Sequence, residues 1–347
     1  MKPSLSVIIP TFNRAALVQQ AVESVLQQRG GFEFEIIVVD DGSSAETEQG
    51  LRRFKDSIRY VRQGNAGLNP ARNHGLRLAS GDYVAMLDDD DVWLPFKTGL
   101  LMQALLQFPQ AGFVHSNFTI WKPRTDSRRP DGLRSWFTEP GAWEDMYPQW
   151  HELSLADPEP LGLELSTIRV YYGDLYYWSL FGPMVLPSTA IIRRSAIGTD
   201  FRFPENDNTV GDWEFFARLS KLCGGVFVPL DTTLNRSHED AVRLTRVDES
   251  VQLQRRIALI HRVWRQDQAF MDSRKSEVDR VEADCLRRMA RLAIAAGNGA
   301  AARTALRSLR GVAERSTARD RLLWALACAP FAPAAVGLVR SLRARAR

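Results

Sequence analysis

The stretch Asp82-Tyr83-Val84-Ala85-Met86-Leu87-Asp88-Asp89-Asp90-Asp91 places four carboxylates directly after an apolar, strand-like run. Carboxylates this close repel one another unless water or a cation screens them. Hard cations such as Mg²⁺ and Mn²⁺ take oxygen ligands and commonly keep a substrate phosphate among them. The run therefore predicts a strand that ends in a metal site bridging protein and diphosphate. A solvated acidic loop that caps a helix beginning near Pro95 is the alternative.

Strand and helix signals alternate through the first third of the chain. β-Branched runs separated by segments of helical periodicity are typical of βαβ units in a mostly parallel sheet. In such sheets ligands bind beyond the carboxyl ends of the strands, so Asp40, Asp41 and the acidic run are expected at one edge. The expected strands are 5–9, 35–39, 58–62 and 83–87, and the expected helices are 15–28 and 70–79.

The pattern loosens after a helix expected over 95–108 and a short strand over 112–116. Residues 121–183 are rich in Pro, Trp and Tyr, and these rings suit either an ordinary core or stacking on sugars or an apolar partner. From about residue 249 the chain reads as helical. Between these regions the expected elements are a strand over 189–193, a helix over 212–222 and a strand over 225–229.

Composition places the chain among soluble globular proteins. It has 347 residues, of which 45% are hydrophobic and 25% charged, with a formal net charge of +4. A sizeable core is therefore available, and disorder is not expected. The three cysteines are far apart and fit neither a disulfide framework nor a zinc spacing. Because the N-terminus also shows no export-signal pattern, the sequence favours a reducing cytoplasm.

Basic residues gather at the C-terminal end, where ten Arg from Arg303 onward face only two acidic residues. The uncharged stretch 322–339 contains Pro330 and Pro333, which makes it a poor membrane-spanning helix. Two hypotheses follow. The tail either contacts the inner face of the cell membrane peripherally, or it packs against the rest of the chain or forms a homodimer contact.

Five segments, in this order and spacing, resemble the family 2 inverting glycosyltransferases with a GT-A fold. The resemblance covers roughly residues 4–245. Any one segment is weak evidence, whereas the five together are specific. They are Ser6-Val7-Ile8-Ile9-Pro10-Thr11-Phe12-Asn13-Arg14, Ile37-Val38-Val39-Asp40-Asp41-Gly42-Ser43, Ala71-Arg72-Asn73-His74-Gly75, Leu87-Asp88-Asp89-Asp90-Asp91, and Gly211-Asp212-Trp213-Glu214-Phe215-Phe216, followed by His238.

The resemblance implies a division of the chain. An α/β domain of GT-A type, with a Rossmann-like, mostly parallel sheet flanked by helices, is expected over 1–245. Within it, residues 1–120 would form the nucleotide-sugar-binding half and residues 121–245 the acceptor and catalytic half. A C-terminal helical region with the basic tail would occupy 246–347.

Donor binding is the first role that the resemblance implies. Pro10, Thr11, Asn13 and Asp41 would line the donor pocket, with the Asp41 carboxylate accepting the N3–H of a uracil ring. Asp40 is the alternative for this contact, or it serves only as a turn residue before Gly42.

The acidic run carries the implied metal chemistry. Asp88 would face the ribose and Asp90 would ligate Mn²⁺ or Mg²⁺, while Asp89 can substitute in either role. Asp91 is expected to cap the following helix. Arg72 suits the donor phosphates or a base edge, and a structural salt bridge to the acids is its alternative.

Two further positions complete the implied site. His238 resembles the late histidine that completes the metal site in many GT-A enzymes, although a lone His is more often structural or exposed. Asp212 resembles the general base that takes the proton of the acceptor hydroxyl. A helix cap is the alternative for Asp212, and Glu214 is the reserve base.

The sequence therefore predicts a metal-dependent inverting glycosyltransferase that moves a sugar from a nucleotide sugar, first of all a UDP-sugar, to a hydroxyl of a carbohydrate or lipid-linked acceptor. Cell-surface polysaccharide synthesis is the expected setting, and no nucleic-acid partner is expected. A noncatalytic nucleotide-sugar or carbohydrate-binding module and a nucleotidyltransferase are the alternatives. The latter would want a Gly-rich basic loop after the first strand, which residues 10–14 do not supply.

Overall fold

The computed structural model describes residues 4–137, 143–155, 166–205, 207, 209–237, 248–313 and 316–329. The chain forms two compact units, Met1–Arg243 and Leu244–Arg347. Among the helices in these described ranges, none is both long and apolar enough to cross a membrane.

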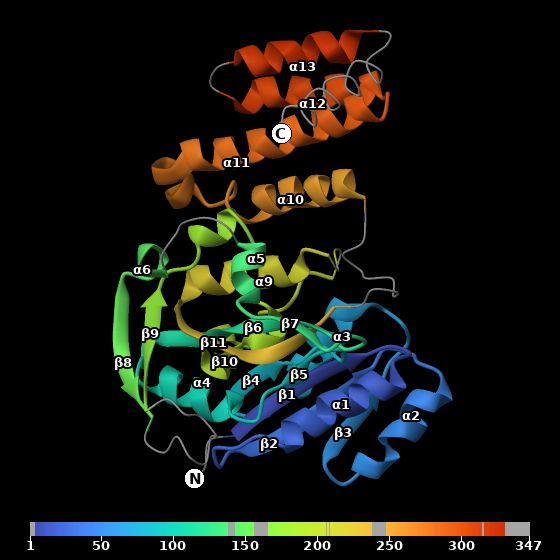
Figure 1. The fold of residues 1–347 in the computed structure, drawn as a ribbon, viewed down its shortest axis with the longest axis vertical. Coiled ribbons are helices and arrows are strands. Elements are labelled where there is room, and N and C mark those ends of the chain that lie inside the picture. Colours follow the sequence, from blue (N-terminus) through green and yellow to red (C-terminus); the bar gives the residue numbers. More distant parts are fainter. Residues whose placement is uncertain are drawn as a thin grey trace. The chain divides into compact units, whose positions relative to one another are not determined.

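One mixed sheet organises the first unit (Figure 1). Its strand order is β3-β2-β1-β4-β10-β6-β11-β9-β8, with β5 paired to β11 and β7 paired to β6. Strands β1 to β4 run parallel, β10 is antiparallel to both of its neighbours, and β6 and β11 are again parallel to each other. The strands are β1 Ser4–Thr11, β2 Glu33–Asp40, β3 Ile58–Arg62, β4 Tyr83–Met86, β5 Val92–Trp93, β6 Ala111–Lys122, β7 Ser127–Arg129, β8 Gln149–Ser154, β9 Thr167–Gly173, β10 Ile191–Arg193 and β11 Gly224–Arg236.

Helices cover both faces of this sheet because side chains alternate along each strand. Val7 and Ile9 of β1 belong to the cluster that holds the buried face of α1, whereas Ile8 belongs to the cluster that holds Phe215 of α9. The helices of this unit are α1 Ala15–Leu26, α2 Ala45–Leu51, α3 Leu68–Leu78, α4 Lys97–Leu106, α5 Gly132–Trp136, α6 Trp143–Met146, α8 Arg194–Ile197 and α9 Gly211–Leu222, with short 3-10 turns η1 Arg52–Phe54, η2 Trp178–Leu180 and η3 Pro187–Thr189.

The expected strands and helices of the first third are confirmed to within a few residues. Two later strands are much longer than expected, because β6 and β11 continue to pair with each other past their apolar halves. Their extensions bury polar side chains such as Thr119 of β6, which donates to Asp231, and Thr232 of β11, which hydrogen-bonds to Ser116. A hydropathy pattern stops where such residues begin.

The aromatic-rich region supplies both core and surface. Tyr147 and Tyr171 are buried beside Phe227 of β11, and the rings of Tyr147 and Phe227 stack with centroids 5.3 Å apart. Trp136 and Trp150 are instead exposed. The core interpretation therefore holds for the buried tyrosines, while the two exposed tryptophans remain open to a ligand or partner.

The second unit is helical in its described part. Its helices are α10 Glu249–Val263, α11 Gln268–Ala295, α12 Gly299–Val312 and α13 Ala318–Cys328. Small and aliphatic residues of α11, α12 and α13 form its core. The Arg310 guanidinium lies 4.3 Å from the ring centroid of Trp324, so both residues take part in packing within the unit. The end of the tail, including most of the stretch 322–339, lies outside the described residues.

Close packing of α3 on β1 gives a test of the fold. A Cβ added at Gly75 would lie 2.3 Å from Cγ2 of Ile8, which is itself fully buried. We expect Gly75→Ala to lower the free energy of unfolding by about 1–3 kcal/mol, because overpacking outweighs the gain in helix propensity. Chemical denaturation measures the change.

The matched control is Gly311→Ala in α12, where an added Cβ meets nothing within 4 Å. That change should stabilise its unit by about 0.5–1 kcal/mol. Gly75→Ala behaving like Gly311→Ala would show that α3 does not pack this closely on the sheet.

Candidate active site

Asp88 begins the acidic turn at the end of β4. Its backbone N donates to Ser188 Oγ at 3.1 Å, and its Oδ1 accepts from Arg72 NH2 at 2.6 Å. The Arg72 side chain is buried, while the Asp88 side chain is 23% exposed. The alternative for Arg72, a salt bridge to the acids, is thus present in the structure.

Arg14 joins the two middle acids. One guanidinium nitrogen, NH1, donates to Asp89 Oδ1 at 2.8 Å and to Asp90 Oδ2 at 3.0 Å. Asp89 is buried and also accepts from Thr11 Oγ1 at 2.8 Å. Burial raises the pKa of Asp89 to about 6, although the charge of Arg14 opposes the rise. Asp89 therefore points into the protein, whereas the side chain of Asp90 is 21% exposed.

The expected role of Asp91 as a helix cap is wrong. The residue before α4 is Phe96, and no side chain caps that helix. Asp91 is buried, and its Oδ1 accepts from Asn235 Nδ2 at 3.0 Å and from the backbone N of Arg236 at 3.3 Å. Strand β5 separates the acids from α4, so Asp91 is turned toward β11 instead. Burial and the nearby charges of Asp90 and Asp88 raise its pKa well above the ordinary value.

The two acids after β2 organise loops beside this turn. Asp40 is fully buried, accepts from the backbone N of Ser43 at 2.7 Å and is hydrogen-bonded by the Tyr60 hydroxyl. These contacts are those of the turn role of Asp40. Asp41 accepts from the backbone N–H groups of Ala66 and Gly67 at 2.9 and 2.8 Å, and from a Gln63 amide. It thereby shapes the loop between β3 and α3.

The loop after β1 lies at the same edge of the sheet as the acids. Thr11 is the last residue of β1 and follows Pro10, and both are buried. Asn13 adopts a positive φ of 54°. Its backbone N donates to Ser43 Oγ at 2.9 Å, and its Oδ1 accepts from the backbone N of Ser44 at 2.8 Å. The loops after β1 and β2 are thus tied together next to the acids.

Asp212 reaches the acidic turn from α9, more than a hundred residues further along the chain. It is the second residue of that helix, where Val210 occupies the N-cap position. Burial raises the pKa of Asp212 above its ordinary value, Arg72 opposes the rise, and Asp88 adds to it. The carboxylate therefore lies within electrostatic range of Arg72 and Asp88. Glu214, the reserve base, is buried two residues further along α9.

Two asparagines of α3 hydrogen-bond to the segment that leads to Asp212. Neither was predicted as a site residue from the sequence. Asn69 Nδ2 donates to the carbonyls of Pro204 and Asp207 at 2.8 and 3.0 Å. Asn73 exchanges hydrogen bonds with the backbone of Phe203 at 2.9 and 2.8 Å. We call this contact the asparagine clamp. The sequence signal that could have indicated this contact is Asn73, which directly follows Arg72 in the segment 71–75.

The donor set at this edge suits a hard cation. Asp88 and Asp90 offer partly exposed carboxylates, and a buried oxygen of Asp91, Oδ2, has no hydrogen-bond partner. Across the described ranges, no group of three or more His, Cys, Asp or Glu side chains is arranged around a common metal position. Further ligands would have to come from substrate phosphate or from His238, which lies outside the described residues.

Comparison with known proteins agrees with this geometry. Residues 6–152 match the family Glycosyl transferase family 2. This part of the chain is similar to the members of that family.

Parts of this chain are also similar to curated relatives. The chain is 44% identical over 118 residues to the GalNAc(5)-diNAcBac-PP-undecaprenol beta-1,3-glucosyltransferase of Campylobacter jejuni, a match that covers 33% of this chain and 37% of the relative. It is 41% identical over 90 residues to the hyaluronan synthase of Pasteurella multocida, which covers 25% and 9%. The chain thus spans well under half the length of these relatives.

Solved structures confirm the GT-A fold that the sequence predicted. S. aureus TarS 1–349 in complex with UDP-GlcNAc has a TM-score of 0.57 and 17% identity, covering 94% of this chain and 90% of that one. The mannosyltransferase PcManGT from Pyrobaculum calidifontis, in complex with GDP-Man and Mn2+, has a TM-score of 0.54 and 16% identity, covering 99% and 81%. At these identities the likeness concerns the fold.

The buried position of Arg72 gives a test of the site's electrostatics. Arg72→Met should lower the free energy of unfolding by about 2 kcal/mol, because Asp88 loses its cation but can still draw on water. It should also raise the pKa of Asp212 further, since Arg72 now holds it down. Denaturation and NMR titration of the Asp212 carboxyl measure the two effects.

The control is Arg77→Met on the same helix, where the side chain is exposed. It should change the unfolding free energy by less than about 0.5 kcal/mol. An unchanged Asp212 titration in Arg72→Met would contradict the proximity of these two groups.

Proposed function

We propose that this chain is a metal-dependent inverting glycosyltransferase that moves a sugar from a nucleotide sugar, first of all a UDP-sugar, to a hydroxyl of a carbohydrate or lipid-linked acceptor. The observation that carries the proposal is the convergence of Asp212 with Arg72 and Asp88. The charges of Arg72 and Asp88 act on the pKa of Asp212, which supports a candidate base close to the acids that follow β4. Cell-surface polysaccharide synthesis at the cytoplasmic side is the proposed setting.

Asp212 would act as the general base. Inversion requires the acceptor hydroxyl to attack the anomeric carbon from the face opposite the leaving diphosphate, and a carboxylate must take the proton as the bond forms. Burial makes Asp212 a stronger base than an exposed aspartate, because it raises the pKa of the carboxyl. The asparagine clamp supports this role, since it fixes the segment directly before α9.

The cation would be held by Asp90, with His238 as the second protein ligand. Arg236 supports this arrangement: its Nε donates to the backbone O of Asp90 at 3.0 Å, two residues before His238 in the chain. A bound Mn²⁺ or Mg²⁺ stabilises the negative charge that develops on a leaving diphosphate. Arg14 would release Asp90 on binding and keep its contact with Asp89.

The nucleoside would lie against Asp41, Pro10 and Thr11, with Asn13 shaping the loop. Asp41 Oδ2 accepts only the Gly67 N–H among the described groups, so the oxygen retains a lone pair for the N3–H of uracil. The Asp88 carboxylate is placed for a ribose hydroxyl. UDP-GlcNAc in TarS and GDP-Man with Mn2+ in PcManGT support a nucleotide-sugar donor and a metal.

The acceptor would bind over the segment 121–245. The name of the Campylobacter jejuni relative contains an undecaprenol-linked saccharide, which supports a lipid-linked acceptor. A membrane-surface role for the basic tail suits such an acceptor, and a homodimer contact is the other role proposed for that tail.

Asp90→Ala tests the metal assignment. Because Asp90 is the proposed direct ligand, the variant should lose cation-dependent binding of UDP, with affinity falling at least about a hundredfold. Its fold should persist, since Arg14 keeps Asp89 as a partner. Calorimetric titration with UDP and Mn²⁺ measures the loss.

The control for this change is Asp126→Ala, an exposed acid far along the chain. It should bind UDP and Mn²⁺ like the parent. Parent-like binding by Asp90→Ala would move the metal role to Asp88 or Asp89.

Asp212→Asn separates chemistry from binding. The amide keeps the shape but cannot take a proton, so transfer should fall at least about a hundredfold while donor affinity changes little. In the parent, kcat/KM should fall as the pH drops through the raised pKa of Asp212, because protonation removes the base. Transfer assays over a pH series measure both effects.

Glu214→Gln is the matched control on the same helix. It should retain transfer, whereas near-normal turnover of Asp212→Asn with loss in Glu214→Gln would exchange the two roles. Donor binding without transfer in the parent would favour the noncatalytic module.

A further inference from the structure

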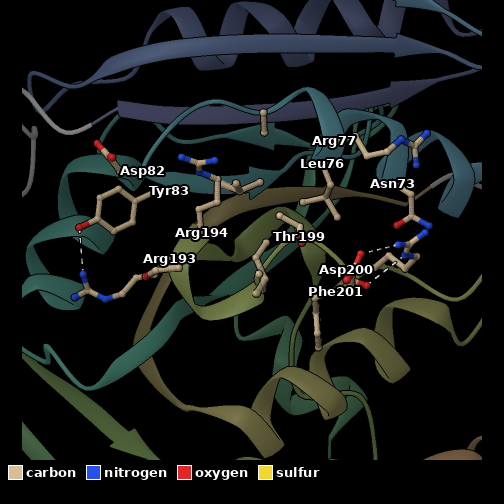
Figure 2. A pocket seen from close by; sticks show the side chains of 16 residues that line it. Asn73, Leu76, Arg77, Asp82, Tyr83, Arg193, Arg194, Thr199, Asp200 and Phe201 are labelled. Carbon is tan, nitrogen blue, oxygen red and sulfur yellow. Dashed lines mark hydrogen bonds and ion pairs between the residues drawn. The ribbon is translucent and has the colours of Figure 1, made fainter.

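Figure 2 shows the residues that line a cavity of about 730 Å³. It lies between the C-terminal half of α3, the first residues of β4, and the segment 193–202 that contains α8. We call it the α3–α8 cavity. Its volume falls within the range of small-molecule pockets, and none of the residues proposed to contact the donor or the metal lines it.

Two unpaired guanidinium groups line this cavity. Arg77 of α3 and Arg194 of α8 are exposed, and within the described part of the chain neither side chain makes a hydrogen bond or an ion pair. A third guanidinium, Arg202, donates to Asp200, whose side chain is 95% exposed. An exposed pair of this kind contributes little stability, so Arg202 is also available to an anion.

Two charged residues that line the cavity, Arg193 and Asp82, are held by hydrogen bonds. Arg193 donates to the carbonyls of Ala111 and Leu105 at 2.8 and 2.9 Å and to the Tyr83 hydroxyl at 3.2 Å. The carboxylate of Asp82 is engaged with Ser4. Asp82 and Arg193 are thus occupied, whereas the Arg77 and Arg194 side chains have no such partner among the described residues.

The cavity includes Asn73 of the asparagine clamp but lies apart from the acidic turn. It is lined by Tyr83, the first residue of β4, whereas Asp88 follows the opposite end of that strand. Five residues of extended chain span roughly 16 Å. A ligand in the cavity therefore does not compete directly with a donor held by the acidic turn.

We propose that the α3–α8 cavity binds a ligand that carries a phosphate group on a partly apolar body. Guanidinium groups recognise phosphate oxygens through paired, charge-assisted hydrogen bonds. Leu76, Ile197 and Phe201 supply apolar lining beside them. Two sources share this chemistry: a soluble phosphorylated metabolite and the headgroup of an anionic lipid.

Inorganic pyrophosphate, titrated by calorimetry in metal-free buffer, tests the proposal with the full chain. The double variant Arg77→Met/Arg194→Met should bind it at least about tenfold more weakly than the parent. Two controls should bind it like the parent: Arg128→Met, which removes an exposed arginine elsewhere, and Asp90→Ala, which alters the acidic turn. Thermal denaturation should show the double variant folded as the parent is, because both side chains are exposed.

Equal affinity in the parent and the double variant would overturn the proposal, and so would a loss confined to Asp90→Ala. Vesicles distinguish the sources. Displacement of pyrophosphate by phosphatidylglycerol vesicles, but not by phosphatidylcholine vesicles, would identify the headgroup. Binding of pyrophosphate that neither vesicle displaces would identify a soluble ligand. No binding of either probe by the parent would remove the site.

Discussion

The four adjacent acidic residues at the end of β4 are held by arginines from three separate elements, two of which pair with the carboxylates and one of which binds a backbone carbonyl. Arg14 comes from the loop after β1, Arg72 from α3, and Arg236 from the end of β11. Losing one of these arginines removes a partner from the turn and therefore destabilises it. The acidic turn therefore fixes the relative positions of the first strand, a helix and the last strand of the unit.

This compensation divides the four acids into two kinds. Asp89 and Asp91 are buried and hydrogen-bond to other parts of the protein, whereas Asp88 and Asp90 have partly exposed carboxylates. The family resemblance assigns the ribose contact to Asp88 and the metal contact to Asp90. These are the two acids that solvent can reach. The inner acids hold the turn in the shape that exposes the outer ones.

The sequence predicted the parts of the fold and site that depend on neighbouring residues. The consecutive strands and helices of the first third were predicted from their hydrophobic pattern. The acids at the ends of β2 and β4 were also predicted to lie at one edge of the sheet, as they do. Side-chain contacts between residues far apart in the chain could not be predicted from the sequence. Asp91 stands just before helix-start signals, yet its partner is Asn235, 144 residues away. The asparagine clamp was missed for the same reason, because a buried polar residue in a helix gives no hint of the backbone it will bind.

Strand β10 has a consequence for how the chain is made. Its three residues join β4 to β6, and Ile191 pairs with Ala85, roughly 100 residues earlier. During synthesis β1 to β4 can pair as soon as they emerge, but the free edge of β4 must wait for β10. At typical translation rates this interval lasts roughly 5–20 s. An unpaired strand edge is a template for wrong association, so the nascent protein is most exposed to aggregation before its shortest central strand arrives.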